Sequence, residues 1–484
     1  MIKKIVNGNV YFWLVLHIAL GFLAGLNHNI AIGWAYVLIG STVIATLKYR
    51  REFVLHYFFA YYVSFELFAR MLRLTPFVPV ESGKYLAMFL MLIGLSQKPN
   101  NIGKFKVSNT GLAICVLSVP SIFFMKLDDT FWSNLVFCWF GIFDLGLFVL
   151  YFSNFSFSKE EIINIFKLMV YPLISISAYL FVNTPTLSDL QFGISANAEA
   201  SGNFGPNQVS SILGVGIFVV SIALIMGYTL FKNKFVDIGI LLLFIFRCVL
   251  TVSRGGMFSA ILGVAIIYFL SSKSKSINQR IARFATFTII TLSVFFTFQY
   301  VNKISGNTLN ERYRGTTVDV YNGEKESDLE TLTDGRSTIA LAEIEIFLHN
   351  PMFGVGPGQS STYWDISQKF IADDAAGNEV VASHTEFTRL LAEHGLMGLV
   401  ICILLIYPMW FYWKKRRELF TRGFAYYLNL GFLVFGLSMS VHSSMRTMIT
   451  PFFFGLAFAG MNIRPASKDK MSSSIIEKPF LKTT

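Results

Sequence analysis

Apolar runs separated by short polar connections fill most of the 484-residue chain. Many of these runs approach the ~20 residues that a helix needs to cross a bilayer. Fourteen of them can be marked, at about 10–26, 30–47, 53–70, 84–96, 109–125, 131–152, 163–182, 207–231, 235–251, 256–271, 283–301, 394–413, 423–440 and 446–462. The runs at 84–96 and 235–251 are short enough to be broken or re-entrant, so we expect twelve to fourteen spans. The pattern predicts an all-α polytopic integral membrane protein.

The first run leaves a choice between a transmembrane helix and a cleavable signal peptide. Lys3 and Lys4 precede the apolar stretch from Val10 to Leu26, which suits both interpretations. A convincing small-residue cleavage site does not follow, and a second apolar run begins almost at once. We therefore predict a first transmembrane helix.

Positive charge is concentrated in every second connection between the runs. The basic connections contain Lys48, Arg50 and Arg51; Lys98, Lys104 and Lys106; Lys232 and Lys234; Lys273, Lys275, Arg280 and Arg283; and Lys414, Lys415, Arg416 and Arg417. The connection at 183–206, by contrast, has no Lys or Arg. Because basic loops stay on the cytoplasmic side of a membrane, the alternation predicts that both termini are cytoplasmic.

Composition supports the same class of protein. Hydrophobic residues make up 54% of the chain and charged residues 14%, whereas soluble domains carry roughly 25% charged residues. The net charge of +11 lies mainly in the predicted cytoplasmic connections, which favours a membrane over nucleic acid as the partner. Neither disulfides nor a zinc site is predicted, because no C-x-x-C spacing occurs and the cysteines all lie in apolar runs, at Cys115, Cys138, Cys248 and Cys402.

One predicted external segment is much longer than the others. Residues 302–391 contain 7 Lys and Arg residues but 14 Asp and Glu residues, a net charge of −7. An unbroken loop of this length is uncommon unless it is functional. We divide the chain into N-terminal transmembrane helices, a transmembrane core, the large external loop, C-terminal transmembrane helices and a disordered cytoplasmic tail, at 1–200, 201–301, 302–391, 392–463 and 464–484.

The large loop carries signals for two helices. The turn-and-cap sequence DGRS precedes STIALAEIEIFLHN, and Pro351 ends that helix. A capping box begins the second helix, in which the Ser383 side chain bonds the N–H of Glu386 and Glu386 bonds back. Helical spacing then gives one apolar face, formed by Phe387, Leu390, Leu391 and His394. Gly395 breaks the helix before the next span.

His384 follows the predicted cap and occupies the first position of the second helix. The positive end of the helix dipole disfavours an imidazolium there, which leaves a neutral ring able to accept a proton near pH 7. The same position also suits an ordinary solvated histidine. Taken alone, this stretch favours the solvated residue.

Arginines on the predicted external side are candidates for binding an anion. Arg254 lies in TVSRGGMFS between two apolar runs, and the two glycines after it would let a ligand approach the backbone. Arg336 starts the first loop helix, where free N–H groups and the guanidinium fork suit phosphate oxygens. A snorkelling or salt-bridged arginine is the alternative for each. Arg446, in VHSSMRTM, and Arg73 are weaker candidates of the same kind.

Polar side chains also open the apolar run that follows GNFGPNQVSS. Asn207 and Gln208 there are able to bind sugar hydroxyls, although capping of the helix is the more conservative interpretation. The sequence FGVGPGQS lacks the strand and the G-K-[ST] of nucleotide-binding loops, and it predicts a turn with positive φ. The acidic pairs at 128–129 and 373–374 have no metal-ligand neighbours, so neither a metal nor a cofactor is predicted.

Several of these motifs, taken in order, resemble the O-antigen ligase and polymerase family. They are GNFGPNQ before a span, SRGG between spans, and HNPMFGVGPG and SHTEF…LLAEHGLMGL around the large loop, over roughly residues 200–410. The resemblance implies a GT-C-like glycosyltransferase of the bacterial inner membrane, with a helical periplasmic loop over the catalytic cavity. Such enzymes serve O-antigen, capsule or exopolysaccharide assembly. They move a glycan from an undecaprenyl-diphosphate carrier to lipid A-core, another lipid-linked repeat or a protein hydroxyl, generally without a metal.

The resemblance also implies roles for individual residues. The family's membrane arginine falls on Arg254, its loop arginine on Arg336 and its loop histidine on His384. In these roles the arginines stabilise the leaving diphosphate, and the histidine takes the proton of the acceptor hydroxyl. Thr385 stands where ligases often carry Asn, which leaves the acceptor open and favours a polymerase. Further candidates for substrate binding are Asn207, Gln208 and Arg446.

Two other classes of function are alternatives to a glycan transferase. A transporter or flippase of lipid-linked oligosaccharide would carry charged residues in spans around a central cavity. The charged residues within the runs are few and dispersed, at Glu66, Arg70, Asp144 and Arg247. A scaffold protein would not require Arg254, Arg336 and His384 together. The sequence therefore favours the transferase.

Overall fold

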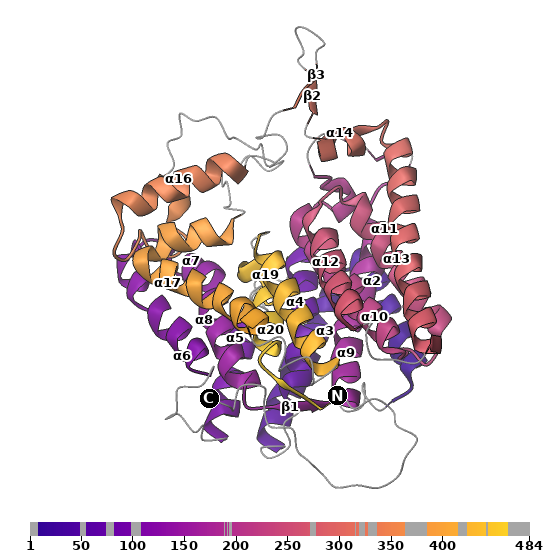
Figure 1. Ribbon diagram of the computed structural model, residues 1–484, viewed down its shortest axis with the longest axis horizontal. Coiled ribbons are helices and arrows are strands. Elements are labelled where there is room, and N and C mark those ends of the chain that lie inside the picture. The colour runs from indigo at the N-terminus through magenta and orange to yellow at the C-terminus, as the bar shows by residue number, and fades with distance from the viewer. Residues whose placement is uncertain are drawn as a thin grey trace.

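A computed structural model describes most of the chain, and it is almost entirely helical, as predicted. The described residues are 8–48, 55–73, 82–97, 108–187, 189–190, 192, 196–271, 277–314, 316–318, 325–327, 336–363, 385–414, 424–441 and 444–462. His384, Ser383 and the acidic pair at 373–374 lie outside these residues. The helices gather into one body with a smaller group of helices at its upper end (Figure 1).

The helices of the first half follow the predicted apolar runs. They are α2 (Val10–Leu26), α3 (Asn29–Lys48), α4 (Leu55–Met71), α5 (Ser82–Gln97), α6 (Ser108–Ser118), α7 (Phe131–Asn134), α8 (Phe140–Phe152) and α9 (Lys159–Asn183). A 3-10 turn, η1 (Pro120–Phe124), follows α6, and a π-helical turn, η2 (Leu135–Trp139), joins α7 to α8.

The second half continues the pattern and adds the helices of the large loop. They are α10 (Pro206–Met226), α11 (Lys234–Leu250), α12 (Gly255–Ser271), α13 (Ile277–Ile304), α14 (Thr308–Arg314), α16 (Arg336–His349), α17 (Glu386–Lys414), α19 (Phe424–Ser440) and α20 (Ile449–Leu456). Three short turns lie between them, at η3 (Glu199–Ser201), η5 (Ser360–Tyr363) and η6 (Ser444–Arg446).

Among the described residues, six helices are long and apolar enough to cross a membrane, at Asn29–Leu47, Phe131–Phe152, Lys159–Asn183, Pro206–Met226, Arg283–Ile304 and Glu386–Tyr412. Shorter apolar helices accompany them, at Val10–Leu26, Gly83–Leu95, Asn109–Phe124, Gly255–Leu270 and Tyr426–Ser440. The fold is that of an all-α polytopic membrane protein. The runs suspected of being broken form the continuous helices α5 and α11, whereas Pro120 divides the run at 109–125 because proline interrupts helical hydrogen bonding.

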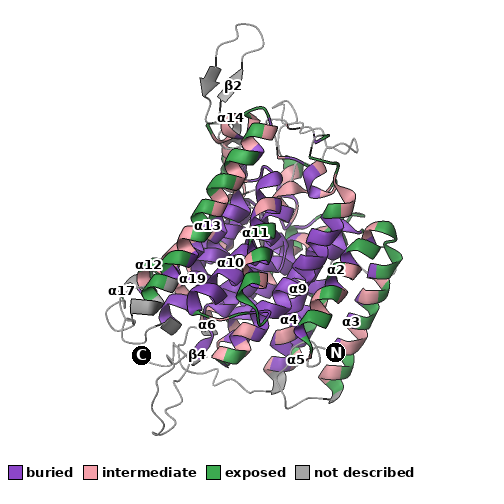
Figure 2. Ribbon diagram, turned by 90° about the vertical axis from the view of Figure 1, so that its right-hand side faces the viewer, coloured by how far each residue is buried: buried purple, intermediate pink, exposed green. Residues whose placement is uncertain are grey.

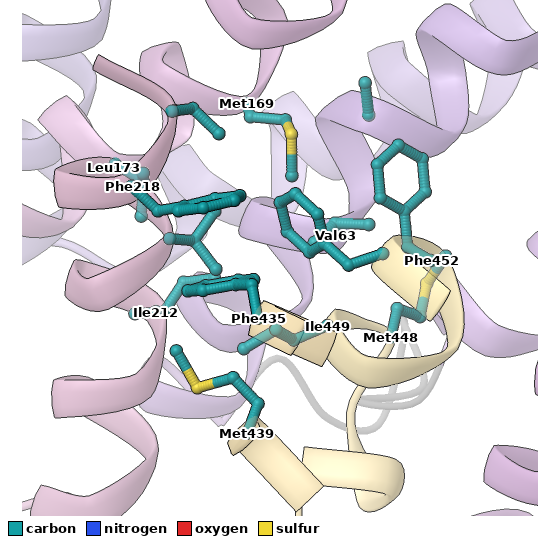
Figure 3. Close-up of a cluster of buried hydrophobic side chains, with 14 of the residues drawn as sticks. Val63, Met169, Leu173, Ile212, Phe218, Phe435, Met439, Met448, Ile449 and Phe452 are labelled. Atoms are coloured by element: carbon teal, nitrogen blue, oxygen red, sulfur yellow. The ribbon is translucent and has the colours of Figure 1, made fainter. Parts of the chain in front are cut away.

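Aromatic side chains fill the centre of the helical body. The rings of Phe218 on α10 and Phe435 on α19 stack with centroids 4.1 Å apart and planes only 2° apart. Phe452 on α20 lies in the same cluster (Figure 3). The helices α9 and α10 are surrounded by others, whereas α3 and α13 expose one side along their length (Figure 2). Apolar side chains on those outer helices are free to face lipid.

The two ends of the helical body differ. Strands β1 (Ser156–Ser158) and β4 (Gly460–Asn462) pair in parallel at one end, with Phe157 opposite Met461. At the other end lie α14, α16 and the antiparallel hairpin of β2 (Thr316–Val318) and β3 (Lys325–Ser327), in which Thr317 faces Glu326 (Figure 1). We call these the strand end and the loop end.

Helices α10 and α12 touch through their backbones. A Cβ atom at Gly214 would lie 2.4 Å from the carbonyl oxygen of Gly256, and one at Gly256 would lie 1.9 Å from that of Ser210. Small residues let membrane helices approach this closely. The contact fixes the start of α12, and therefore Arg254 just before it, against α10.

Gly214→Ala is expected to lower the free energy of unfolding by about 1–3 kcal/mol, because the added methyl group forces two backbones apart. Unfolding titrations in detergent micelles would measure the change. Gly239→Ala on the exposed side of α11, where nothing lies within 4 Å, is the control. Equal stability of the two variants would contradict the backbone contact.

Candidate functional site

Arg254 lies between α11 and α12 at the loop end, partly exposed to solvent. Its guanidinium carbon is 5.8 Å from the ring centroid of Tyr313 on α14. That helix follows α13 directly and forms the first part of the large loop. The loop therefore begins beside Arg254, and an aromatic ring covers one face of this cation.

Asn207 and Gln208 lie in the first turn of α10, close to the same place. The side-chain oxygen Oδ1 of Asn207 accepts a hydrogen bond of 2.7 Å from the hydroxyl of Ser253, the residue before Arg254. No side chain caps α10, so Asn207 holds the neighbouring segment rather than the helix start, contrary to the conservative interpretation. Within the described chain, Gln208 Oε1 is enclosed and receives no hydrogen bond.

Arg336 is the first residue of α16, as predicted, and is half-buried. The helix packs along α17. The hydroxyls of Thr385 and Thr388 both donate to Glu343 Oε2 of α16, at 3.0 and 2.5 Å. The chain directly after His384 is thereby fixed to the helix that Arg336 begins, although His384 itself is outside the described residues.

A buried ion triad at the start of α17 is a feature that the sequence analysis missed. Arg389 is fully buried and donates to Glu386 on one side and to Glu393 on the other, the latter at 2.5 Å. The Ser360 hydroxyl binds the second oxygen of Glu393 at 3.1 Å. The Glu386 carboxylate receives Arg389, and the predicted capping box with Ser383 lies outside the described residues. The spacing E-x-x-R-x-x-x-E carried the signal, since it places all three residues on one helix face.

The glycine-rich segment FGVGPGQS forms the predicted turn. Gly354, Gly356 and Gly358 have φ values of 70°, 96° and 75°. The turn docks on α17 through hydrogen bonds from Val355 N to Ala392 O and from Gly356 N to Glu393 O, at 3.0 and 3.1 Å. Its backbone therefore supports the ion triad.

The kink of α17 falls at the predicted residue. Gly395 has φ 61° and ψ −138°, and it separates the buried first turns from the longer apolar part. His394, predicted on the apolar face of this helix, is fully buried and bonds the Ser121 hydroxyl at 2.7 Å through Nδ1. This bond joins the large loop to the segment between α6 and α7.

Arg446, in η6, meets residues from the first half of the chain. Its guanidinium carbon lies 5.3 Å from the Phe137 ring centroid, and that of Arg70 lies 5.1 Å from the same ring. Arg70 pairs with Glu66 at 2.8 Å and also donates to the carbonyl oxygen of Arg446 at 2.6 Å. The prediction that the charged residues of the spans are dispersed was wrong for Glu66 and Arg70, which lie one helical turn apart.

The ranges that the structure describes contain no group of three or more His, Cys, Asp or Glu side chains that could hold a metal ion. Asp128 is exposed and accepts from the hydroxyl and N–H of Thr130, at 2.6 and 2.9 Å, which lowers its pKa. It caps a turn. The four cysteines are buried and not bonded to one another, as predicted.

A pocket of about 680 Å³ lies at the strand end, and neither Arg254 nor Arg336 lines it. Ser158, Lys159 and Tyr228 are among its lining residues, and the Lys159 ammonium lies 3.6 Å from the Tyr228 ring centroid. Since the candidate residues lie at the loop end, the pocket has no part in the chemistry considered below.

Arg389→Met is expected to lower the free energy of unfolding by about 3–5 kcal/mol, because Glu386 and Glu393 would remain buried without a cation. Thermal unfolding and hydrogen exchange of the first turns of α17 would measure the loss. Replacing the whole triad by Gln, Met and Gln should recover much of it, since no charge is then left unpaired. Unchanged exchange in Arg389→Met would contradict this role of the triad.

Comparison with known families gives one match. Residues 239–403 match the family model described as O-antigen ligase. Neither the curated proteins nor the solved structures give a match to the chain. The matched segment contains Arg254, Arg336 and His384, and it spans α11 to α17.

Proposed function

We propose that this member of the O-antigen ligase family moves a glycan from an undecaprenyl-diphosphate carrier to an acceptor hydroxyl at the external face of the membrane. The family makes the chain a membrane enzyme of the glycan ligase and polymerase type. The observation that carries the finer proposal is the match itself, because one segment holds both arginines and the histidine. The alternation of basic connections supports an external position of the loop.

The leaving group determines what the arginines do. When the glycosidic bond to the carrier breaks, the diphosphate oxygen gains negative charge, and donors already in place stabilise that charge best. We assign this role to Arg254 and Arg336, whose guanidinium forks match phosphate oxygens. Asn207 supports it indirectly, since its bond to Ser253 holds the segment that carries Arg254.

His384 supplies the base. The acceptor oxygen attacks the anomeric carbon, and its proton passes to a neutral ring nitrogen of His384. The bond between the anomeric carbon and the diphosphate oxygen breaks, and the diphosphate leaves with the electron pair. Attack from the face opposite the leaving group inverts the anomeric centre.

Thr385 bears on the identity of the acceptor. Its hydroxyl donates to Glu343 and lies 2.6 Å from the hydroxyl of Thr388, so its side chain serves the contact between α16 and α17. An Asn at this position would present a different set of donors. We favour a repeat-unit polymerase, in which the acceptor is a second lipid-linked glycan, over a ligase.

Purified protein incubated with undecaprenyl-diphosphate oligosaccharide separates the candidate functions. Chain extension indicates a polymerase, and transfer to lipid A-core or to a protein indicates a ligase. The alternative of a transporter or flippase predicts movement of the lipid-linked glycan without any covalent product. That last result would overturn the transferase.

His384→Ala is expected to lower the rate of transfer by roughly 10²–10⁴-fold, because the acceptor proton loses its base. Donor binding should change little. Product formation by the purified variant measures the effect. His349→Ala, an exposed histidine at the end of α16, is the matched control and should retain full activity. Full activity of His384→Ala would exclude it as the base.

Arg254→Ala and Arg336→Ala are each expected to weaken donor binding by about 10- to 100-fold, the loss of a charge-assisted hydrogen bond. Titration of the purified protein with undecaprenyl-diphosphate oligosaccharide measures the dissociation constant. Arg280→Ala at the exposed start of α13 tests for a general effect of charge. Unchanged affinity in either loop-end variant would remove that arginine from the diphosphate site.

A further inference from the structure

Three cations surround a single aromatic ring at the loop end. The charged groups of Arg70, Lys84 and Arg446 lie 5.1, 5.2 and 5.3 Å from the ring centroid of Phe137. Their exposed fractions are only 4%, 0% and 9%. They come from α4, α5 and η6, so segments far apart in the sequence converge on the turn η2 that carries Phe137.

Glu66 is the carboxylate that contacts this group, and both of its oxygens are engaged. One oxygen pairs with Arg70 at 2.8 Å, and the other accepts the N–H of Met448 at 2.8 Å. The Lys84 ammonium points to the carbonyl oxygens of Val136 and Phe137, each 3.3 Å away. Glu66 and these backbone carbonyl groups therefore offer oxygen atoms to Arg70 and Lys84.

Asp144 is a further acidic residue near this group, since its charge interacts with those of Lys84 and Glu66. It is buried, and among the described residues neither of its carboxylate oxygens receives a hydrogen bond. It therefore forms no ion pair with Arg446.

The Arg446 guanidinium is the unsatisfied member of the cluster. Across the described part of the chain it donates no hydrogen bond, and its Nε–H is enclosed without an acceptor. The residue retains 9% exposure, and its two terminal nitrogens are not enclosed. Donors on one edge of a nearly buried guanidinium therefore remain available from outside.

The backbone holds Arg446 in place. A Cβ atom at Gly141 would lie 1.8 Å from the carbonyl oxygen of Met445, so η6 rests directly on α8. The carbonyl oxygen of Arg446 accepts from Arg70, and Met448 is tied to Glu66. The turn cannot easily carry the side chain away to solvent.

The stabilisation that the Phe137 ring gives Arg446 is smaller than the cost of burying the unpaired charge of Arg446. A cation over an aromatic face gains about 0.5–2 kcal/mol, whereas burying an unpaired charge costs several kcal/mol even after relaxation. Buried cations in membrane proteins pair with acidic groups or mark ligand sites. An anion at the open edge of Arg446 would supply the missing partner.

We propose that Arg446, with Arg70 and Lys84 beside it, forms a binding site for a phosphate-type oxyanion, separate from the diphosphate site assigned to Arg254 and Arg336. In the polymerase reaction proposed above, on which this assignment of the ligand rests, the second lipid-linked substrate carries such a diphosphate. An anionic lipid headgroup presents the same chemistry. The charges of Arg446, Glu393 and Arg389 all act on Cys138, the residue after Phe137, so the site adjoins the ion triad of α17.

Thermal unfolding with and without inorganic pyrophosphate tests the site in the full-length protein. Pyrophosphate should raise the unfolding temperature of the wild type, because a ligand that binds the folded state stabilises it. Arg446→Gln should reduce that response to the part that the Arg254 and Arg336 site gives, and pyrophosphate should bind at least about tenfold more weakly at the altered site. Without pyrophosphate, Arg446→Gln should be no less stable than the wild type, since it removes a buried unpaired charge.

Arg283→Gln is the matched control. Arg283 is also a buried arginine, but it lies at the strand end and donates to the carbonyl oxygen of Ile225 at 3.2 Å. This variant should lose stability and keep the response to pyrophosphate. A merely structural Arg446 would instead behave like Arg283, destabilised by substitution with an unaltered response, and that result would overturn the proposal. Partial recovery in Arg446→Lys would support it.

Two further arms identify the source of the anion. Undecaprenyl diphosphate should raise the unfolding temperature of the wild type more than that of Arg446→Gln. Two molecules of undecaprenyl diphosphate should bind to each wild-type protein, and one to each molecule of the variant. Equal protection of the wild type by phosphatidylglycerol, absent with phosphatidylcholine, would assign the site to a lipid headgroup instead. Binding is measured without turnover, so loss of transfer in His384→Ala cannot be confused with loss of this site.

Discussion

Buried charge at the loop end governs how the large loop joins the helical body. Arg389 lies between Glu386 and Glu393 with no exposure, and such a group is stable only when every charge has a partner. Ser360 and the glycine-rich turn reach the same place, through bonds to Glu393. The first turns of α17 are thereby fixed to the segment that follows α16, and the loop acquires a rigid base.

From that base, contacts run outward to the residues proposed for catalysis. The hydroxyls of Thr385 and Thr388 tie the start of α17 to Glu343, and Arg336 begins the helix that carries this glutamate. On the other side of the loop end, the backbone contact of α10 with α12 holds Arg254 in place. Helices therefore fix the two arginines from opposite sides of the loop end, while α14 reaches over Arg254 through Tyr313.

Much of this arrangement could be predicted from single stretches of sequence, and the rest could not. The hydropathy pattern predicted the helices. Glycine residues predicted the turn at 354–358 and the kink at Gly395, because a positive φ is a local property of the backbone. The apolar positions of α17 predict one buried face of the helix. The triad lies on a second buried face, which those positions do not indicate. The group around Phe137 depends on residues hundreds of positions apart, and no local pattern reports such a meeting. The placement of His384 stays a prediction.

The charged residues proposed to act on the donor and those proposed to bind the second substrate lie in different parts of the chain. The family match at 239–403 contains Arg254, Arg336 and His384, which are the groups a shared donor reaction would need. Arg70, Lys84 and Arg446 all lie outside that segment. Residues that stabilise the leaving diphosphate are needed wherever the same donor is used. Residues that select the second substrate can differ from one enzyme to another. If the site proposed at Arg446 binds the second substrate, helices outside the matched segment are where the acceptor would be distinguished.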